Sequence, residues 1–218
     1  MRSMIRNVAA SKWGFFAMTD DDPPERNAMQ KFYCIYGETM TAWTSLETAL
    51  FHWFMYSTKM DEAIARAVFY SARNFTGRRD MLIAALPYAP LSELEMEFIK
   101  AALKRVRRYA EFRNKAIHRE PILDARRESP TWLQMILVEG SSIETNPDAI
   151  TQKQLGIATK NFLDLRTMLE TILPSQRSES ASVELYLRLV RELPNEACSK
   201  ERAPIQPQKK SPPQPPEA

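Results

Sequence analysis

The stretch Ala28–Ser57, AMQKFYCIYGETMTAWTSLETALFHWFMYS, decides the fold. Its large apolar side chains recur every three or four residues, the period of an α-helix that buries one wide face. They are Phe32, Ile35, Tyr36, Met40, Trp43, Leu46, Leu50, Trp53 and Phe54. The spacing therefore predicts a long, heavily buried helix over residues 28–57. Because such a face must be covered by other elements, we expect it to lie inside a helical domain.

The same helical period returns in five later segments, namely 61–73, about 76–86, 92–118, 151–172 and 182–193. Ser92 and Glu95 have the spacing of a capping box, which favours a helix start at that point. Pro121 excludes the α conformation from the residue before it, so we expect that helix to end close to His118 or Arg119.

The region after Pro121 has a different character. Thr131–Glu139 is a β-prone run between Pro130 and Gly140, and the short pair Ile122–Leu123 could pair with it. Taken together, the patterns predict an all-α fold, an antiparallel helical bundle with a short β-hairpin insertion at about 121–140.

The composition fits one globular domain with two appendages. The chain has 218 residues, of which 44% are hydrophobic, enough to bury a core without disulfides or metals. We expect residues 1–27 to be a flexible lead-in, residues 28–195 to be the helical domain, and residues 196–218 to be disordered. That last segment is rich in proline and is either a solubilising or a docking tail.

The rare residue types exclude several classes of function. Five glycines leave no Gly-rich phosphate loop, which argues against Rossmann and P-loop enzymes. Two histidines and two cysteines cannot build a conventional zinc cluster or a CxxC redox pair, so we expect no metal and no cofactor. No apolar run is long enough to span a membrane, and no signal segment is evident. We therefore expect a cytoplasmic protein.

The charge is concentrated in one segment. The whole chain carries a net charge of +3, but residues 100–127 hold ten basic and three acidic side chains, a local net charge of +7. Either this segment is an ordinary solvated helix face or it is a surface that binds anions.

The hexapeptide Arg113–His118, RNKAIH, lies in that basic segment at the predicted end of a helix. Asn114 and His118 are four residues apart and share a helix face, whereas Arg113 projects from another side. Metal-independent RNA cleavage needs groups that move protons and a cation beside the phosphate. His118 can move protons near neutral pH, Arg113 can hold phosphate, and Asn114 can orient either of them.

Together with Trp43-Thr44-Ser45-Leu46-Glu47 in the first helix, the hexapeptide resembles the HEPN superfamily, whose motif is Arg followed four to six residues later by His. The resemblance covers roughly residues 28–173. It implies an all-α homodimer that brings two motifs into one cleft and, in active members, a metal-independent endoribonuclease of defence or toxin–antitoxin systems. Arg113 and His118 would be catalytic and Asn114 supporting. We expect RNA as substrate, an antitoxin or effector as a further partner, and substrate contacts from nearby cations, namely Arg105, Arg108, Lys115 and Arg119.

A second hypothesis needs no catalysis. The chain would then be a helical module that contacts a protein or a nucleic acid through its basic face, and His118 would be incidental. Two further residues have alternative interpretations. His52, among aromatic residues, is expected to pack in the core. Glu47 either orients Arg113 across the bundle or forms an ordinary salt bridge.

Overall fold

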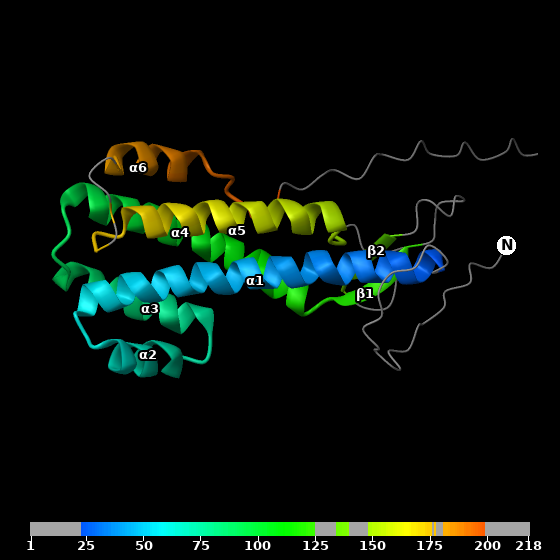
Figure 1. The fold of residues 1–218 in the computed structure, drawn as a ribbon, viewed down its shortest axis with the longest axis horizontal. Coiled ribbons are helices and arrows are strands. Elements are labelled where there is room, and N and C mark those ends of the chain that lie inside the picture. Colours follow the sequence, from blue (N-terminus) through cyan, green and yellow to red (C-terminus); the bar gives the residue numbers. More distant parts are fainter. Residues whose placement is uncertain (1–22, 125–133, 140–147, 176, 178–180, 199–218) are drawn as a thin grey trace, which may run out of the picture.

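The computed structural model describes residues 23–124, 134–139, 148–175, 177 and 181–198. Within these ranges the helices are α1 (Pro24–Thr58), α2 (Glu62–Ser71), α3 (Phe75–Ala85), α4 (Glu93–Ile117), α5 (Gln152–Ile172) and α6 (Val183–Glu192). A 3₁₀ turn, η1 (Leu86–Tyr88), follows α3, and the strands are β1 (Glu120–Asp124) and β2 (Gln134–Val138). Figure 1 shows the helices stacked side by side with the two strands at one end. The predicted all-α fold with a short hairpin is confirmed.

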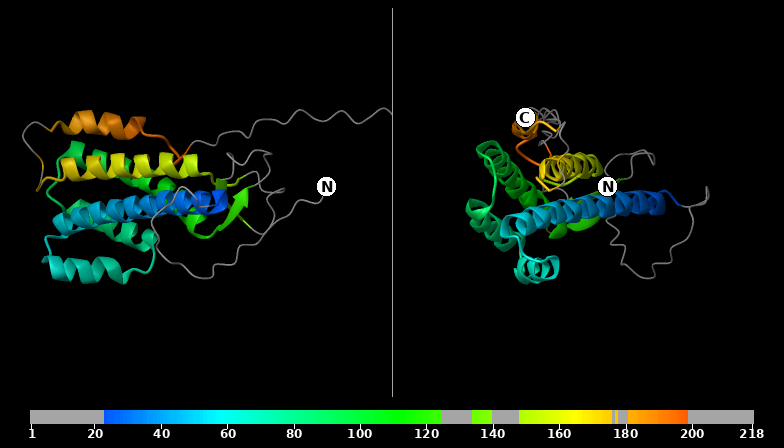
Figure 2. Two further views of the ribbon diagram at one scale, coloured as in Figure 1. Left: turned by 45° about the vertical axis from the view of Figure 1, so that its right-hand side comes forward. Right: turned by 60° about the vertical axis from the view of Figure 1, so that its left-hand side comes forward.

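Helices α1 and α5 lie along each other in the same direction. Thr39, near the middle of α1, contacts Leu155 in the first turn of α5, where the Thr39 hydroxyl donates to the Leu155 carbonyl at 3.4 Å. About four turns further along both helices, the Trp53 indole Nε1 donates to the Leu169 carbonyl at 2.9 Å. Both contacts join residues that are 116 positions apart in the sequence, so a step forward along α1 is matched by a step forward along α5. The two helices therefore run parallel, as the two views of Figure 2 also show.

Helix α4 runs against α1. The Arg113 guanidinium near the end of α4 lies 5.9 Å from the Trp43 ring, whereas Phe98 near its start lies 6.1 Å from the later Trp53. The chain thus runs along the bundle in α1, returns in α4, and runs in the first direction again in α5. This up-down-up path makes neighbouring passes antiparallel and leaves α1 and α5 parallel.

The core forms around α1, as its spacing predicts. Phe32, Trp43, Leu46, Leu50 and Trp53 are almost entirely buried. Each side chain of this size contributes roughly 1.5–3 kcal/mol when removed from water. Because α1 is so thoroughly covered, it is the fixed element against which the end of α4 is positioned.

Side-chain caps define where the helices begin. The predicted capping box is present, since the Ser92 hydroxyl accepts from the Glu95 amide while the Glu95 carboxylate accepts from the Ser92 amide. Thr151 and Gln154 form a second capping box at α5. Helix α3 begins after Asn74, whose side chain accepts from an amide of the first turn. That start is slightly earlier than the predicted one near residue 76.

The hairpin is confirmed with a defined register. β1 and β2 pair antiparallel, with Ile122 opposite Ile136 and Leu123 opposite Met135. A small second core, which includes Phe32 from α1 and Ala116 from α4, packs against the apolar side chains of β2. The hairpin therefore closes the end of the bundle where α4 finishes.

The predicted boundaries shift by a few residues where they can be examined. Helix α1 begins at Pro24, so the last part of the expected lead-in is helical. Ala197 and Cys198 are buried, so packing continues past residue 195. The rest of the expected lead-in and the rest of the expected disordered segment are residues 1–22 and 199–218. Both lie outside the described residues. None of the described helices has the length and apolarity needed to cross a membrane.

Candidate functional site

The last turn of α4 carries the hexapeptide. Helical backbone ends at Ile117, and His118 is the C-cap, with φ −90° and ψ 3°. The His118 amide still donates to the Asn114 carbonyl at 3.1 Å. The end falls where Pro121 predicts it, because a helix cannot continue through the residue before a proline. His118 is therefore held by the helix on one side and by β1 on the other.

Arg113 is anchored inside the bundle. Its side chain is half-buried, and its guanidinium lies over the Trp43 ring at 5.9 Å, within the range of a cation–π interaction. Trp43 itself is 1% exposed. The Arg113 Nε atom is buried and has no hydrogen-bond acceptor among the described residues. The aromatic ring thus fixes the guanidinium while leaving several of its N–H groups uncommitted.

The far end of the Arg113 side chain turns toward Asn114. Its Nη1 donates to the Asn114 Oδ1 at 3.0 Å. Asn114 and His118 are both exposed. The long arginine side chain therefore brings its charge from the core side of α4 to the exposed side, next to a residue that shares a helix face with His118.

Tyr36 is a neighbour of Arg113 that the sequence does not single out as a site residue. It is half-buried and stacks on Phe32, with ring centroids 6.0 Å apart. Burial raises the pKa of the Tyr36 hydroxyl, and the Arg113 charge partly opposes that rise. Tyr36 and Trp43 form the aromatic wall beside Arg113. Their helical spacing predicts only burial, because periodicity does not distinguish a core residue from the wall of a site.

Two of the cations expected to bind substrate are committed to contacts within the protein. Arg105 donates to the carbonyls of Val190 at 3.2 Å and Arg191 at 2.6 Å, and also to the Asn195 side chain. It thereby ties α4 to the end of α6. The structure therefore gives Arg105 a structural contact, since backbone carbonyls accept from its Nε and Nη2. The expected substrate contact of Arg105 stays a prediction.

Arg119 is likewise turned inward. Its side chain is 5% exposed, its Nη1 donates to the Asp148 carbonyl, and its Nη2 lies 3.8 Å from the Glu139 carboxylate. It holds the hairpin to the segment that leads into α5. The structure thus gives Arg119 a structural contact too, and its expected substrate contact stays a prediction.

Arg108 and Lys115 remain available. Arg108 is half-exposed and Lys115 is exposed, and neither side chain has a hydrogen bond or ion pair within the described ranges. Arg108 lies four residues after Lys104, and Lys115 lies seven residues after Arg108. These spacings place the three side chains near one stripe of α4. The basic segment is consequently divided among several faces, while its Arg126 and Arg127 lie outside the described residues.

Glu47 does not orient Arg113. Its carboxylate accepts from Arg78 at 3.1 Å, and the two side chains are only 12% and 21% exposed. The Arg78 guanidinium also lies 5.0 Å from the Tyr70 ring. The salt bridge expected as the simpler alternative is present, and Arg78 is its partner. His52, the other histidine, is half-buried beside Phe51.

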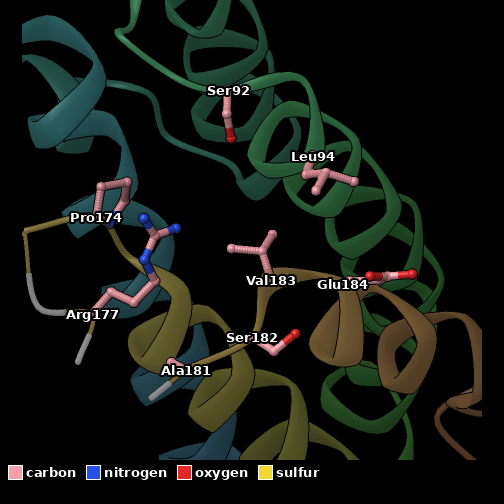
Figure 3. A pocket seen from close by; sticks show the side chains of 8 residues that line it. All are labelled: Ser92, Leu94, Pro174, Arg177, Ala181, Ser182, Val183 and Glu184. Atoms are coloured by element: carbon pink, nitrogen blue, oxygen red, sulfur yellow. The ribbon is translucent and has the colours of Figure 1, made fainter. Parts of the chain in front are cut away.

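A hollow of about 630 Å³ lies far from the hexapeptide, where the starts of α4 and α6 meet the end of α5. Figure 3 shows the Arg177 side chain reaching into it beside Pro174, with Val183 on the facing side. Arg177 pairs with Glu95 at 2.6 Å, and Ser92 and Ser182 cap their own helices. Arg177, Ser92 and Ser182 are therefore used in holding three helix ends together.

No group of three or more metal-ligating side chains occurs within the described residues. What the end of α4 offers is a positioned guanidinium, an exposed amide and an exposed imidazole. These groups can hold a phosphate, orient a ligand and transfer protons. Comparison of the chain with family models, curated proteins and solved structures finds no match.

Proposed function

We propose that the chain is a metal-independent endoribonuclease that acts as a HEPN-like homodimer. The carrying observation is the 3.0 Å hydrogen bond from Arg113 to Asn114 beside an exposed His118. It places a cation, an amide and a proton-transfer group at one helix end, which is the set that RNA cleavage through the 2′-hydroxyl needs.

In the proposed reaction the RNA 2′-oxygen attacks the adjacent phosphorus and the bond from phosphorus to the 5′-oxygen breaks. The 2′-hydroxyl loses its proton, the departing 5′-oxygen gains one, and a 2′,3′-cyclic phosphate remains. His118 from each protomer of the dimer serves in proton transfer. Arg113 stabilises the charge on the phosphate, and Asn114 holds Arg113 in place.

Of the four cations predicted to contact substrate, we assign this role to Arg108 and Lys115, whose side chains have no partner within the described part of the chain. Such contacts to phosphates supply affinity without sequence preference. The cellular setting we propose is cytoplasmic, as the nuclease of a defence or toxin–antitoxin system.

The test is cleavage of total RNA by the purified full chain in the presence of EDTA. We expect fragments with 2′,3′-cyclic phosphate ends, and we expect His118→Ala and Arg113→Ala to lower the rate by at least about 100-fold. Arg66→Ala is a matched control, because Arg66 is exposed, pairs with Glu62 one turn away and, like Arg113, has its guanidinium over an aromatic ring, that of Phe51 at 4.8 Å.

Because His118 is exposed, its replacement should leave the melting temperature nearly unchanged, so a loss of cleavage would report on chemistry. If His118→Ala cleaves as fast as the parent chain, the proposal fails. If the parent chain binds RNA but cleaves none, and binding survives His118→Ala, the non-catalytic binding module is the better description.

A further inference from the structure

A groove of about 520 Å³ runs between α4 and the α3–η1 segment. It belongs to a different part of α4 from the hexapeptide. The residues that line it are Arg79, Ile83, Leu86, Pro87, Met96, Lys100, Leu103, Lys104 and Arg107.

The floor of this groove is aliphatic. Leu86 and Leu103 are buried at its base, and Met96 is half-buried. Ile83 is 46% exposed on its α3 side, beside the exposed Pro87. Among the described residues, no aromatic ring lines the groove. An apolar strip of this kind is suited to burying aliphatic side chains of another molecule.

The rim of the groove is basic. Lys100, Lys104 and Arg107 follow each other at spacings of four and three, so they form one stripe along α4. All three are exposed, and none has a hydrogen bond or ion pair within the described residues. Arg79, on the opposite side, is bonded to Asp80. Since no carboxylate of the described part of the chain lines the groove, the rim presents net positive charge to whatever binds there.

We propose that this groove binds an acidic amphipathic helix of a partner protein. The apolar face of such a helix would cover Ile83 and Met96, and its flanking carboxylates would meet the unpaired cations of α4. The groove follows α4 from Met96 to Arg107, a length of about 16 Å, which corresponds to three turns of the bound helix.

The chemistry of the groove favours a peptide over RNA. Single-stranded RNA binds through rings on which its bases stack, and the described residues that line the groove are apolar or basic and include no aromatic ring. Toward the hexapeptide, the exposed Glu111 follows Arg107 on the same stripe of α4. Its carboxylate would repel a phosphate backbone running from the groove to His118, so the groove is not a continuation of the proposed RNA site.

The two sites are nevertheless on one face of α4. Arg107, Asn114 and His118 are separated by seven and four residues, and about 16 Å of helix lies between Arg107 and His118. A three-turn helix in the groove would therefore leave His118 uncovered. The inference stands apart from the proposed nuclease activity, because it rests on groove residues that take no part in cleavage.

Fluorescence anisotropy tests the proposal with the full chain and a labelled synthetic peptide. The probe is an amphipathic helix with leucines on one face and glutamates on its flanks. We expect it to bind, and we expect a peptide of identical composition with its leucines scattered to bind at least tenfold more weakly. The charge reversal Lys100→Glu/Lys104→Glu should also weaken binding at least tenfold.

Lys31→Glu/Lys59→Glu is the matched control, because both lysines are exposed and neither lines the groove. Ile83→Ser removes exposed apolar surface and should weaken binding. Its melting temperature should equal that of the parent chain, which would show that this variant folds. The proposal is overturned if the helical probe does not bind, if both peptides bind equally, or if the control weakens binding as much as the groove reversal. A single-stranded oligonucleotide that binds the groove in place of the helical probe would assign it to RNA instead.

Discussion

Arg113 donates a hydrogen bond from Nη1 to the Oδ1 of Asn114, its neighbour in α4, at 3.0 Å. Adjacent residues on a helix point about 100° apart, so this contact requires the arginine side chain to fold around the helix. It does so over the Trp43 ring. One end of Arg113 is thus buried against α1, while its charge is presented beside exposed groups.

Arg113→Lys should reduce RNA cleavage at least about tenfold although the charge is kept. Lysine carries a point charge without the planar fork, so it cannot both lie on the Trp43 ring and hold the Asn114 oxygen. Single-turnover cleavage with EDTA present measures the effect, and thermal unfolding checks the fold. Arg66→Lys serves as the control. Equal cleavage by Arg113→Lys would mean that charge alone matters and that the observed geometry does not.

Arg105→Ala should lower stability whereas Arg108→Ala should lower RNA affinity, although both residues are basic and on the same helix. Arg105→Ala removes the contacts that tie α6 to α4, so we expect a loss of about 1–3 kcal/mol in unfolding free energy. Faster amide exchange in α6 should accompany it. Arg108→Ala should keep the stability and weaken RNA binding. A stable Arg105→Ala variant that only loses RNA affinity would contradict the structural role of Arg105.

Glu95 should make the fold sensitive to acid. Burial raises the pKa of its carboxyl, but hydrogen bonds from Ser92 and the nearby Arg177 charge outweigh this, so the net pKa is lowered. The ionised form is therefore favoured in the folded state. The stability that it contributes is complete above the ordinary glutamate value of about 4.5 and is lost as the pH falls through the lowered pKa.

Glu95→Gln tests this dependence, because glutamine can still accept from the Ser92 amide but carries no charge. We expect the variant to lose about 1 kcal/mol at neutral pH, since water screens a pair whose Arg177 side chain is 34% exposed. The loss relative to the parent chain should disappear in acid. Chemical denaturation across the acidic range measures it, and a constant difference at every pH would refute the assignment.

The helices could be predicted because their signals are local. The three- and four-residue spacing of apolar side chains from Phe32 to Phe54 marks the buried face of α1. Ser92 with Glu95, and Pro121 after His118, mark the two ends of α4. The hairpin could be placed for the same reason, since its β-prone runs are bounded by proline and glycine.

The partners of the charged groups could not be predicted in the same way. Arg105 and Arg119 are indistinguishable in sequence from their solvent-facing neighbours, yet their acceptors are the carbonyls of Val190 and Asp148, 85 and 29 residues away. The Glu47 carboxylate accepts a hydrogen bond from Arg78, which lies 31 residues later in the sequence. An arginine has donors for many acceptors, and only the packing of distant segments decides which acceptor lies within reach.

The sequence by itself determined that this chain is helical, where α4 ends, and that Asn114 and His118 share a face there. These properties depend on periodicity and on residues within a turn of each other. The tertiary structure decided that Arg113 rests on Trp43 and reaches Asn114, and that the basic segment divides into structural ties, available cations and a groove rim. The physical reason is that a side chain's contacts depend on which distant surfaces pack against its helix.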